Sequence, residues 1–176
     1  MKTASLLLAT AAILALPACA TMGTGQGASA NTTLLGADGT SHGVAKVTQT
    51  TSGLKVTVAA TGLTPGVHAV HVHTTGTCTA PAFTSAGGHW NPMGKQHGME
   101  NPMGSHMGDM PNMTVNADGR GTLEYTIAGG ALSDGTTPLF DADGAAVVVH
   151  ALPDDNKSDP AGKAGDRLAC GVLTLG

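Results

Sequence analysis

Short segments in which apolar and polar residues alternate constrain this chain more than any other feature. Alternation runs through 44–50 and again through 54–58, and a period of two is typical of a strand with one buried face. Turn-forming sequences separate these segments, among them Ala37-Asp38-Gly39 and Ser52-Gly53. The other predicted strands are 32–36, 66–73, 112–116, 121–127, 145–150 and 168–174. The pattern predicts an all-β domain, an eight-stranded antiparallel Greek-key sandwich or flattened barrel.

Two connections between predicted strands, 74–111 and 151–167, are far longer than the others. Loops of this length inside a compact domain are usually functional. The 176 residues suffice for one ordinary domain. Only 11% of them are charged, the net charge is −4, and no basic run is present, which argues against a nucleic-acid partner.

The N-terminal 18 residues have the character of an export signal. Lys2 gives a positive start, and the apolar run from Leu6 to Leu16 is too short to span a membrane. Two cleavage patterns fit. The segment 16–19 resembles a lipobox with Cys19 as the lipidated residue, while 18–20 also satisfies the small-residue rule of an ordinary signal peptidase. The lipobox is favoured, because lipidation accounts for the odd one of three cysteines.

The region after the signal is small, polar and rich in glycine. Residues 19–31 are therefore expected to form a flexible tether. Residues 32–176 are expected to form the folded domain. If Cys19 is lipidated, the only membrane contact is that anchor, because no apolar stretch reaches the roughly 20 residues of a spanning helix.

Six histidines and one aspartate form a pattern with metal-binding chemistry. His71 and His73 are two residues apart in a predicted strand, so both side chains point to one face. The full set of candidate ligands is His71, His73, His89, His97, His106, Asp109 and His150. Imidazole is a common ligand of zinc and copper, and a carboxylate can complete a zinc site. Seven ligands are one short of two four-ligand sites, so one histidine must bridge two ions.

The two remaining histidines have a simpler interpretation. His42 lies in a predicted turn, and His68 is three residues from His71, so it faces away from the ligand pair. A single histidine in a β protein is usually a polar surface residue or a buried residue with hydrogen-bond partners. We therefore expect structural roles for both.

The histidines lie in segments that resemble the metal-site motifs of the copper/zinc superoxide dismutases. These segments are Gly66-Val67-His68-Ala69-Val70-His71-Val72-His73, Ala86-Gly87-Gly88-His89-Trp90-Asn91-Pro92, Ser105-His106-Met107-Gly108-Asp109, Val149-His150 and Gly165-Asp166-Arg167-Leu168-Ala169-Cys170-Gly171-Val172. The resemblance covers residues 32–176.

The resemblance implies one copper and one zinc ion per subunit, bound by ligands that share one histidine. The implied copper ligands are His71, His73, His89 and His150, and the implied zinc ligands are His89, His97, His106 and Asp109. Asp154 falls where the family has an aspartate that links the two sites. Such carboxylates fix ring tautomers.

The resemblance also implies an activity, in which a copper ion alternates between Cu(II) and Cu(I) to convert two superoxide anions into oxygen and hydrogen peroxide. Arg167 is expected to dock the anion, since a guanidinium is always charged, and His89 to carry a proton. Lys157 and Lys163 either add to this attraction or are ordinary surface residues. A disulfide between Cys78 and Cys170 is implied as well, which an oxidising compartment permits.

These expectations describe an exported bacterial enzyme, periplasmic or anchored to the outer membrane, that protects the envelope from superoxide and is either a monomer or a homodimer. A non-catalytic copper-binding or copper-delivery module on the same fold is the alternative. Six of the eight methionines fall in 93–113. Thioether sulfur suits Cu(I), so this loop could capture copper, although filling of an irregular loop is the favoured explanation.

Overall fold

The computed structural model describes residues 27–176, whose regular structure is almost entirely strand. The strands are β1 (Ser29–Gly36), β2 (Ser41–Thr50), β3 (Gly53–Ala60), β4 (Gly66–His68), β5 (Val70–His73), β6 (Met113–Val115), β7 (Gly121–Ala128), β8 (Ala146–His150), β9 (Arg167–Val172) and β10 (Thr174–Leu175). A 3-10 turn, η1 (Thr84–Ala86), interrupts the first long loop. Within the described residues no helix is long and apolar enough to cross a membrane.

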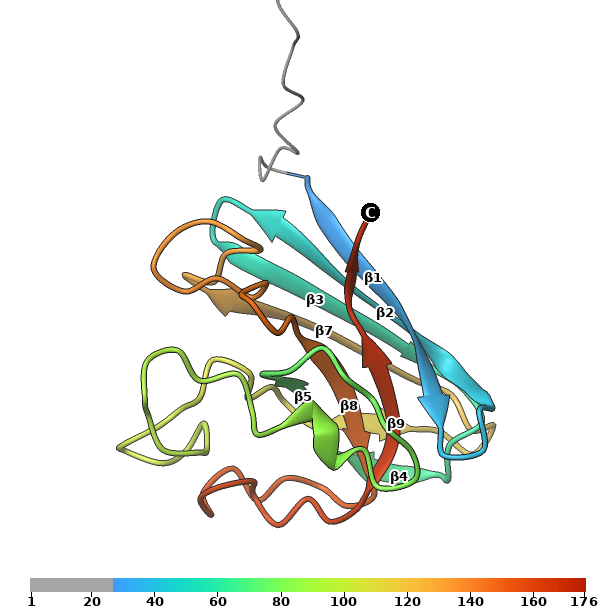
Figure 1. Cartoon of the computed structure of the whole chain (residues 1–176). Coiled ribbons are helices and arrows are strands. Elements are labelled where there is room, and N and C mark those ends of the chain that lie inside the picture. The colour runs from blue at the N-terminus through green and yellow to red at the C-terminus, as the bar shows by residue number, and fades with distance from the viewer. Residues whose placement is uncertain (1–26) are drawn as a thin grey trace, which may run out of the picture.

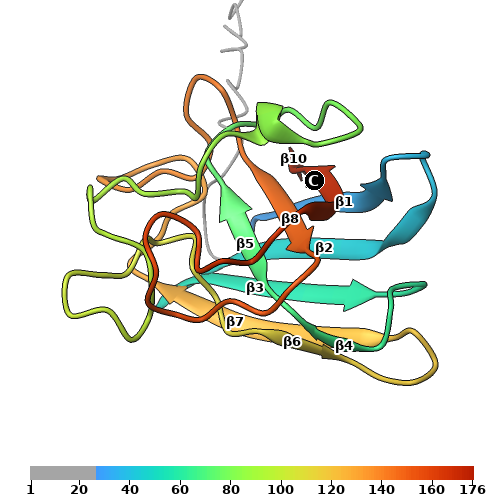
Figure 2. The same cartoon turned by 90° about the horizontal axis from the view of Figure 1, so that it is seen from below.

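The strands form one antiparallel sheet that curls into a flattened, nearly closed barrel, which confirms the predicted fold class (Figure 1). The order is β4-β6-β7-β3-β2-β1-β9-β8-β5, with β10 paired to β1. Neighbours such as β3 and β7, or β1 and β9, are distant in the sequence. Both long loops gather on the same side of the barrel, as the view in Figure 2 also shows.

The described residues contain ten strands instead of the predicted eight, because two predicted strands divide. The segment 66–73 breaks at Ala69, whose N–H donates to the Leu152 carbonyl at 2.9 Å. The chain thereby changes partners, so that β4 pairs with β6 and β5 with β8. The segment 168–174 divides at Leu173, whose N–H donates to the Ala145 carbonyl at 3.0 Å.

Strand β1 begins at Ser29, three residues before the expected domain boundary. Residues 29–31 pair with β2 and β10, so these three residues of the expected tether 19–31 belong to the sheet. The expected signal peptide and Cys19 lie outside the described residues.

The alternating apolar residues of the long strands fill the barrel, as the period of two requires. On β2, Ala45 and Val47 are buried while their neighbours are more exposed. β5 and β8 differ, since every residue of both is buried. The valines of β5 belong to the core cluster, so the histidines of β5 are buried on the opposite side, beneath the loops.

Candidate metal centre

Two adjacent strands carry three of the candidate ligands. β5 and β8 are antiparallel neighbours. Because successive side chains alternate across a strand, His71 and His73 leave β5 on the face away from the core. His150 ends β8, where its N–H donates to the Ala69 carbonyl at 2.9 Å. Backbone pairing therefore sets the spacing of these three residues.

The loop ligands are docked on the free edge of β5, which is the last strand of the sheet. The Val72 carbonyl accepts from the Trp90 N–H at 2.8 Å, and the Val72 N–H donates to the Gly108 carbonyl at 3.0 Å. Trp90 follows His89 and Gly108 precedes Asp109. These bonds bring both loop residues into register with the strand.

Four histidines form what we call the strand cluster: His71, His73, His89 and His150, with one ring nitrogen of each within 4.8 Å of the others. All four are buried. One buried nitrogen on each ring lacks a hydrogen-bond partner: Nδ1 of His71 and Nε2 of the other three. Unpartnered buried polar atoms are rare and destabilising. Four of them facing one another fit a metal ion coordinated by imidazole.

Hydrogen bonds on the far side of the rings determine which nitrogen is free. His73 Nδ1 lies 3.0 Å from the Gly87 carbonyl, and His71 Nε2 lies 2.8 Å from Asp154 Oδ2. His150 Nδ1 makes a longer contact of 3.4 Å with a backbone carbonyl. Carbonyls and ionised carboxylates only accept, so these ring nitrogens carry the hydrogen. The lone pairs of the neutral rings therefore point into the cluster, as metal ligation requires.

The loop cluster consists of His89, His97, His106 and Asp109. Asp109 Oδ1 lies 2.8 Å from His89 Nδ1, 3.0 Å from His97 Nδ1 and 3.4 Å from His106 Nδ1. A tetrahedral zinc site with bonds of about 2.0–2.1 Å has donor–donor edges of about 3.3 Å. Three nitrogens and one oxygen at this spacing fit zinc.

His89 and Asp154 join the two clusters. His89 presents Nδ1 to the loop cluster and its unpartnered Nε2 to the strand cluster. Asp154 accepts from His71 Nε2 at 2.8 Å and from His97 Nε2 at 2.9 Å. Its own N–H donates to the Asn112 side chain at 2.8 Å, which holds the carboxylate in place. A displacement of either residue would affect both clusters.

In the metal-free protein, the strand cluster favours neutral imidazoles. Burial lowers the pKa of His71 to about 4, against the opposing effect of the hydrogen bond that His71 donates to Asp154. Burial and the neighbouring histidines lower the pKa of His150 to about 3, and burial holds the pKa of His73 well below its usual value. The Arg167 guanidinium contributes to lowering the pKa of the latter two.

One histidine of the loop cluster, His97, favours the protonated state. Burial alone would lower the pKa of His97, but hydrogen bonds to Asp109 and Asp154 raise it to about 9. Burial would raise the pKa of Asp109, yet hydrogen bonds from His89 and His97 hold it well below its usual range. A protonated His97 thus lies between two ionised carboxylates when no cation is bound.

Arg167 is held beside the strand cluster. It starts β9 opposite His150, and its guanidinium donates to the carbonyls of Phe83 and Gly87, both at 2.7 Å. The Gly87 carbonyl also accepts from His73 Nδ1. One backbone oxygen therefore positions both the arginine and a candidate ligand.

The two lysines of the second long loop are engaged elsewhere. Lys157 pairs with Glu100 at 2.9 Å and Lys163 with Asp155 at 3.3 Å, and both side chains are exposed. The negative charges of Glu100 and Asp155 offset much of the attraction of the two lysines for an anion. This favours the ordinary surface role for both lysines.

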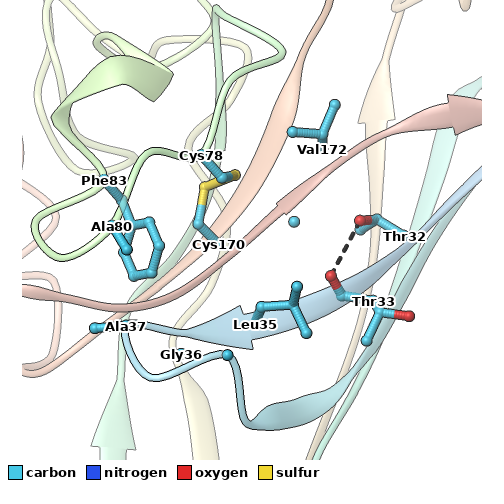
Figure 3. Close-up of a pocket in the computed structure, with 12 residues that line it drawn as sticks. Thr32, Thr33, Leu35, Gly36, Ala37, Cys78, Ala80, Phe83, Cys170 and Val172 are labelled. Atoms are coloured by element: carbon cyan, nitrogen blue, oxygen red, sulfur yellow. Dashed lines mark hydrogen bonds between the residues drawn. A yellow bond between two sulfur atoms is a disulfide. The ribbon is translucent and has the colours of Figure 1, made fainter.

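The predicted disulfide between Cys78 and Cys170 is present, with Cα atoms 5.7 Å apart and a sequence separation of 92. It ties the first long loop to β9, next to Phe83 (Figure 3). A surface hollow of about 500 Å³ lies beside it, and Leu35 lines its opposite side. The bond thus anchors the segment whose carbonyls hold Arg167.

The two histidines expected to be structural lie outside both clusters. His68 is buried, with ring nitrogens 2.8 Å from the His150 carbonyl and 2.9 Å from the Thr64 carbonyl. His42 lies in β2 and contacts the Thr61 carbonyl at 3.2 Å. His68 supports the metal centre by contacting the backbone of a candidate ligand.

The sequence did not predict two residues, distant in the chain, that support candidate ligands through hydrogen bonds. Asp159 Oδ1 accepts from the His97 N–H at 2.6 Å, and Asn112 holds Asp154. Single aspartates and asparagines in loops carry no distinguishing local pattern, and these contacts span 62 and 42 residues. Only the fold could reveal them.

Fold and donor atoms together define a β-barrel protein with two adjacent clusters that fit metal ions and share one histidine. The family described as "Copper/zinc superoxide dismutase (SODC)" matches residues 41–173. A "Superoxide dismutase [Cu-Zn] 2" of Aquifex aeolicus is 43% identical over 150 residues, 84% of this chain and 88% of that protein. A "Superoxide dismutase [Cu-Zn]" of Caulobacter vibrioides is 43% identical over 82% of this chain and 85% of its own length. The chain belongs to the copper/zinc superoxide dismutase family.

Solved structures agree with this assignment. A superoxide dismutase-like protein from Bacillus subtilis superimposes with a TM-score of 0.78 at 35% identity, covering 82% of this chain and 97% of that one. The Cu/Zn superoxide dismutase from Brucella abortus has a TM-score of 0.64 at 28% identity, covering 83% and 99%.

Proposed function

We propose that this chain is a superoxide dismutase, which converts two superoxide anions and two protons into dioxygen and hydrogen peroxide. The observation that carries the proposal is the set of four unpartnered imidazole nitrogens that face one another next to Arg167. Relatives named as Cu-Zn superoxide dismutases at 43% identity support it. The copper-delivery alternative is less favoured, because those relatives carry the name of the enzyme.

The donor sets indicate where each ion binds. All-imidazole donors in the strand cluster suit copper, and the three nitrogens and one carboxylate of the loop cluster suit zinc. When bound, copper supplies a one-electron couple, and zinc supplies a redox-inert positive charge. The chain contributes ligands already fixed in the correct tautomer.

Arg167 and His89 are the residues proposed to act on the substrate. The protein carries a net charge of −4, so attraction of an anion must be local. Arg167 supplies a permanent positive charge beside the strand cluster and is the proposed docking group. The His89 Nε2 atom faces the same cluster without a partner, so it is the atom proposed to hold a proton for the product.

The test is dismutation by the full chain loaded with one copper and one zinc ion, beside Arg167→Ala and Arg167→Lys. We expect fast turnover that falls about 10-fold or more in Arg167→Ala, and a smaller loss in Arg167→Lys, which keeps the charge. Rising salt should slow the unchanged protein most, since salt screens charge attraction. Full metal loading with negligible turnover would contradict the proposal and favour a copper-binding module.

We also propose that the protein is exported, with cleavage before Cys19 and a lipid on that residue, and that it protects the bacterial envelope. The disulfide supports an oxidising compartment. Intact mass of the processed protein distinguishes a lipidated Cys19 from ordinary cleavage. Sedimentation of the metal-loaded protein tests the possible homodimer.

A further inference from the structure

The methionine-rich segment 93–113 divides into two halves that face opposite ways. The inward three are Met107, which packs against the core, and the buried Met110 and Met113. The outward three are Met93, Met99 and Met103, whose exposed fractions are 59%, 42% and 63%. Filling of a gap explains the inward half. It does not explain three long apolar side chains placed in water within eleven residues.

Two turns with the same four-residue sequence carry two of the outward methionines. Asn91-Pro92-Met93-Gly94 and Asn101-Pro102-Met103-Gly104 share one sequence, and each is closed by a bond from the glycine N–H to the asparagine carbonyl, at 3.2 and 2.9 Å. The Asn91 side chain accepts from the Lys95 N–H, and the Asn101 side chain accepts from the Met103 N–H. Each turn therefore holds its methionine at the third position, pointing into solvent.

The loop folds back on itself between these turns. The Gln96 N–H donates to the Met103 carbonyl at 3.1 Å, and Gln96 pairs with Gly104. This contact closes the segment 96–104, which carries Met99 and Met103, with Met93 three residues before it. A methionine side chain has three rotatable bonds, so each of these exposed thioethers is free to change its orientation.

The same loop carries a ligand of the metal centre on its inner side. His97, whose side chain is fully buried in the loop cluster, lies two residues before Met99. The outer side is anchored by the Glu100–Lys157 ion pair and by the Glu100 N–H, which donates to the Asn156 carbonyl at 3.0 Å. Exposed thioethers and a buried candidate ligand therefore belong to one anchored loop, which projects from the sheet (Figure 1).

We propose that Met93, Met99 and Met103 form a binding site for Cu(I) that is separate from the histidine centre and holds copper before it enters that centre. Neutral thioether sulfur is a soft ligand that suits Cu(I), whereas the carboxylate-containing loop cluster suits zinc. Leucine would fill space equally well at these positions but could not bind the ion. Binding involves no electron transfer, and copper stays Cu(I) on this site.

The first test uses the full chain with both clusters already loaded with copper and zinc. Cu(I) is titrated without oxygen against a chromophoric Cu(I) chelator, beside the triple variant Met93→Leu/Met99→Leu/Met103→Leu. We expect one additional equivalent in the unchanged protein and none in the variant. Met113→Leu, which changes a buried methionine, is the matched control and should keep the additional equivalent. The absence of an additional equivalent, or its survival in the triple variant, overturns the site.

The second test locates the ion. Protein with ¹³C-labelled methionine methyl groups, again fully loaded, is titrated with Ag(I) as a redox-inert substitute for Cu(I). The methyl signals of Met93, Met99 and Met103 should shift, while those of Met110 and Met113 stay. Unchanged signals for the outward three contradict the site.

The role in loading has its own measurement. Zinc-loaded, copper-free protein is mixed with Cu(I), and occupancy of the histidine centre is followed in time. The triple variant should acquire copper several-fold more slowly than Met113→Leu does. Equal rates would show that the site, even if it binds Cu(I), does not feed the centre.

Discussion

The strand cluster and the loop cluster share His89, but the protein holds them in different ways. In the strand cluster the nitrogens that face the centre have no partner, and the hydrogen bonds lie on the outer side of the rings. In the loop cluster the facing atoms bond to one another, with Asp109 Oδ1 accepting from two imidazoles. The centre of the strand cluster therefore presents unpartnered ring nitrogens, whereas hydrogen bonds between the candidate ligands occupy the centre of the loop cluster.

The difference follows from what carries the ligands. The strand histidines lie in paired strands with a packed core behind them, so they keep their spacing without a cation. The loop ligands depend on contacts with β5 and with loop 151–167, and in the metal-free protein a protonated His97 lies between Asp109 and Asp154. We infer that copper enters a preformed site, whereas zinc displaces protons.

Removing one ligand from each cluster is expected to have the largest effect. His73→Ala should abolish copper retention, leave zinc in place, and reduce dismutation by more than about 100-fold, since losing even an outer partner of a ligand costs up to that factor in affinity or activity. Asp109→Ala should lose zinc and keep copper. Elemental analysis with activity assays checks both. Loss of both metals in both variants would mean that the clusters are one inseparable unit.

Loss of the disulfide should weaken metal retention in the strand cluster more than in the loop cluster. Replacing Cys78 and Cys170 by serine should lower the free energy of unfolding by about 3–4 kcal/mol, because the bond closes a long loop. It should also loosen the carbonyls that hold Arg167 and His73, so copper is expected to dissociate faster than zinc. Denaturant unfolding and chelator competition measure the two effects. Equal acceleration for both metals would contradict this division.

Asp154 is the residue most suited to test the link between the clusters. Asp154→Asn should weaken binding of both ions by about 10–100-fold, because it alters the hydrogen bonds of His71 and His97 together. Asp155→Asn is the matched control, since this neighbouring carboxylate bonds to Ser158 and Lys163 and not to a histidine. Competition titrations for each metal measure the change. An effect confined to one metal would argue against the link.

His97 of the loop cluster and the histidines of the strand cluster should respond to pH in opposite senses in the metal-free protein. The pKa values of His71 and His150 are about 4 and about 3 when folded and near 6.5 when unfolded. Their unfolded forms therefore bind more protons, and stability is lost as pH falls from about 6.5 to about 4. The pKa of His97 is raised to about 9, so its contribution is complete below about 6.5 and is lost as pH rises through about 9.

Each group changes the unfolding free energy by at most about 1.4 kcal/mol per pH unit. Thermal unfolding between pH 4 and 9 should show a maximum near 6.5. His97→Gln should remove the alkaline decline and His150→Gln should reduce the acid decline. An alkaline decline that persists in His97→Gln would contradict the protonated state assigned to the loop cluster.

Several features were predictable because they depend on local periodicity. Alternation at 44–50 and 54–58 indicated β2 and β3, and the two-residue spacing of His71 and His73 placed them on one face. The division of 66–73 into β4 and β5 was not predictable, since the Ala69 N–H donates to the Leu152 carbonyl and the Ala69 carbonyl accepts from the His150 N–H. These partners lie about 80 residues away in the sequence.

By itself, the sequence determined the all-β class and the set of seven candidate ligands, because side-chain period and donor chemistry are local properties. Only the tertiary structure decided which nitrogen of each ring faces the centre, that Gly87 holds both His73 and Arg167, and that only half of the six methionines in 93–113 are exposed. These features depend on hydrogen bonds and burial between segments that are distant in the chain and become neighbours only when the barrel closes.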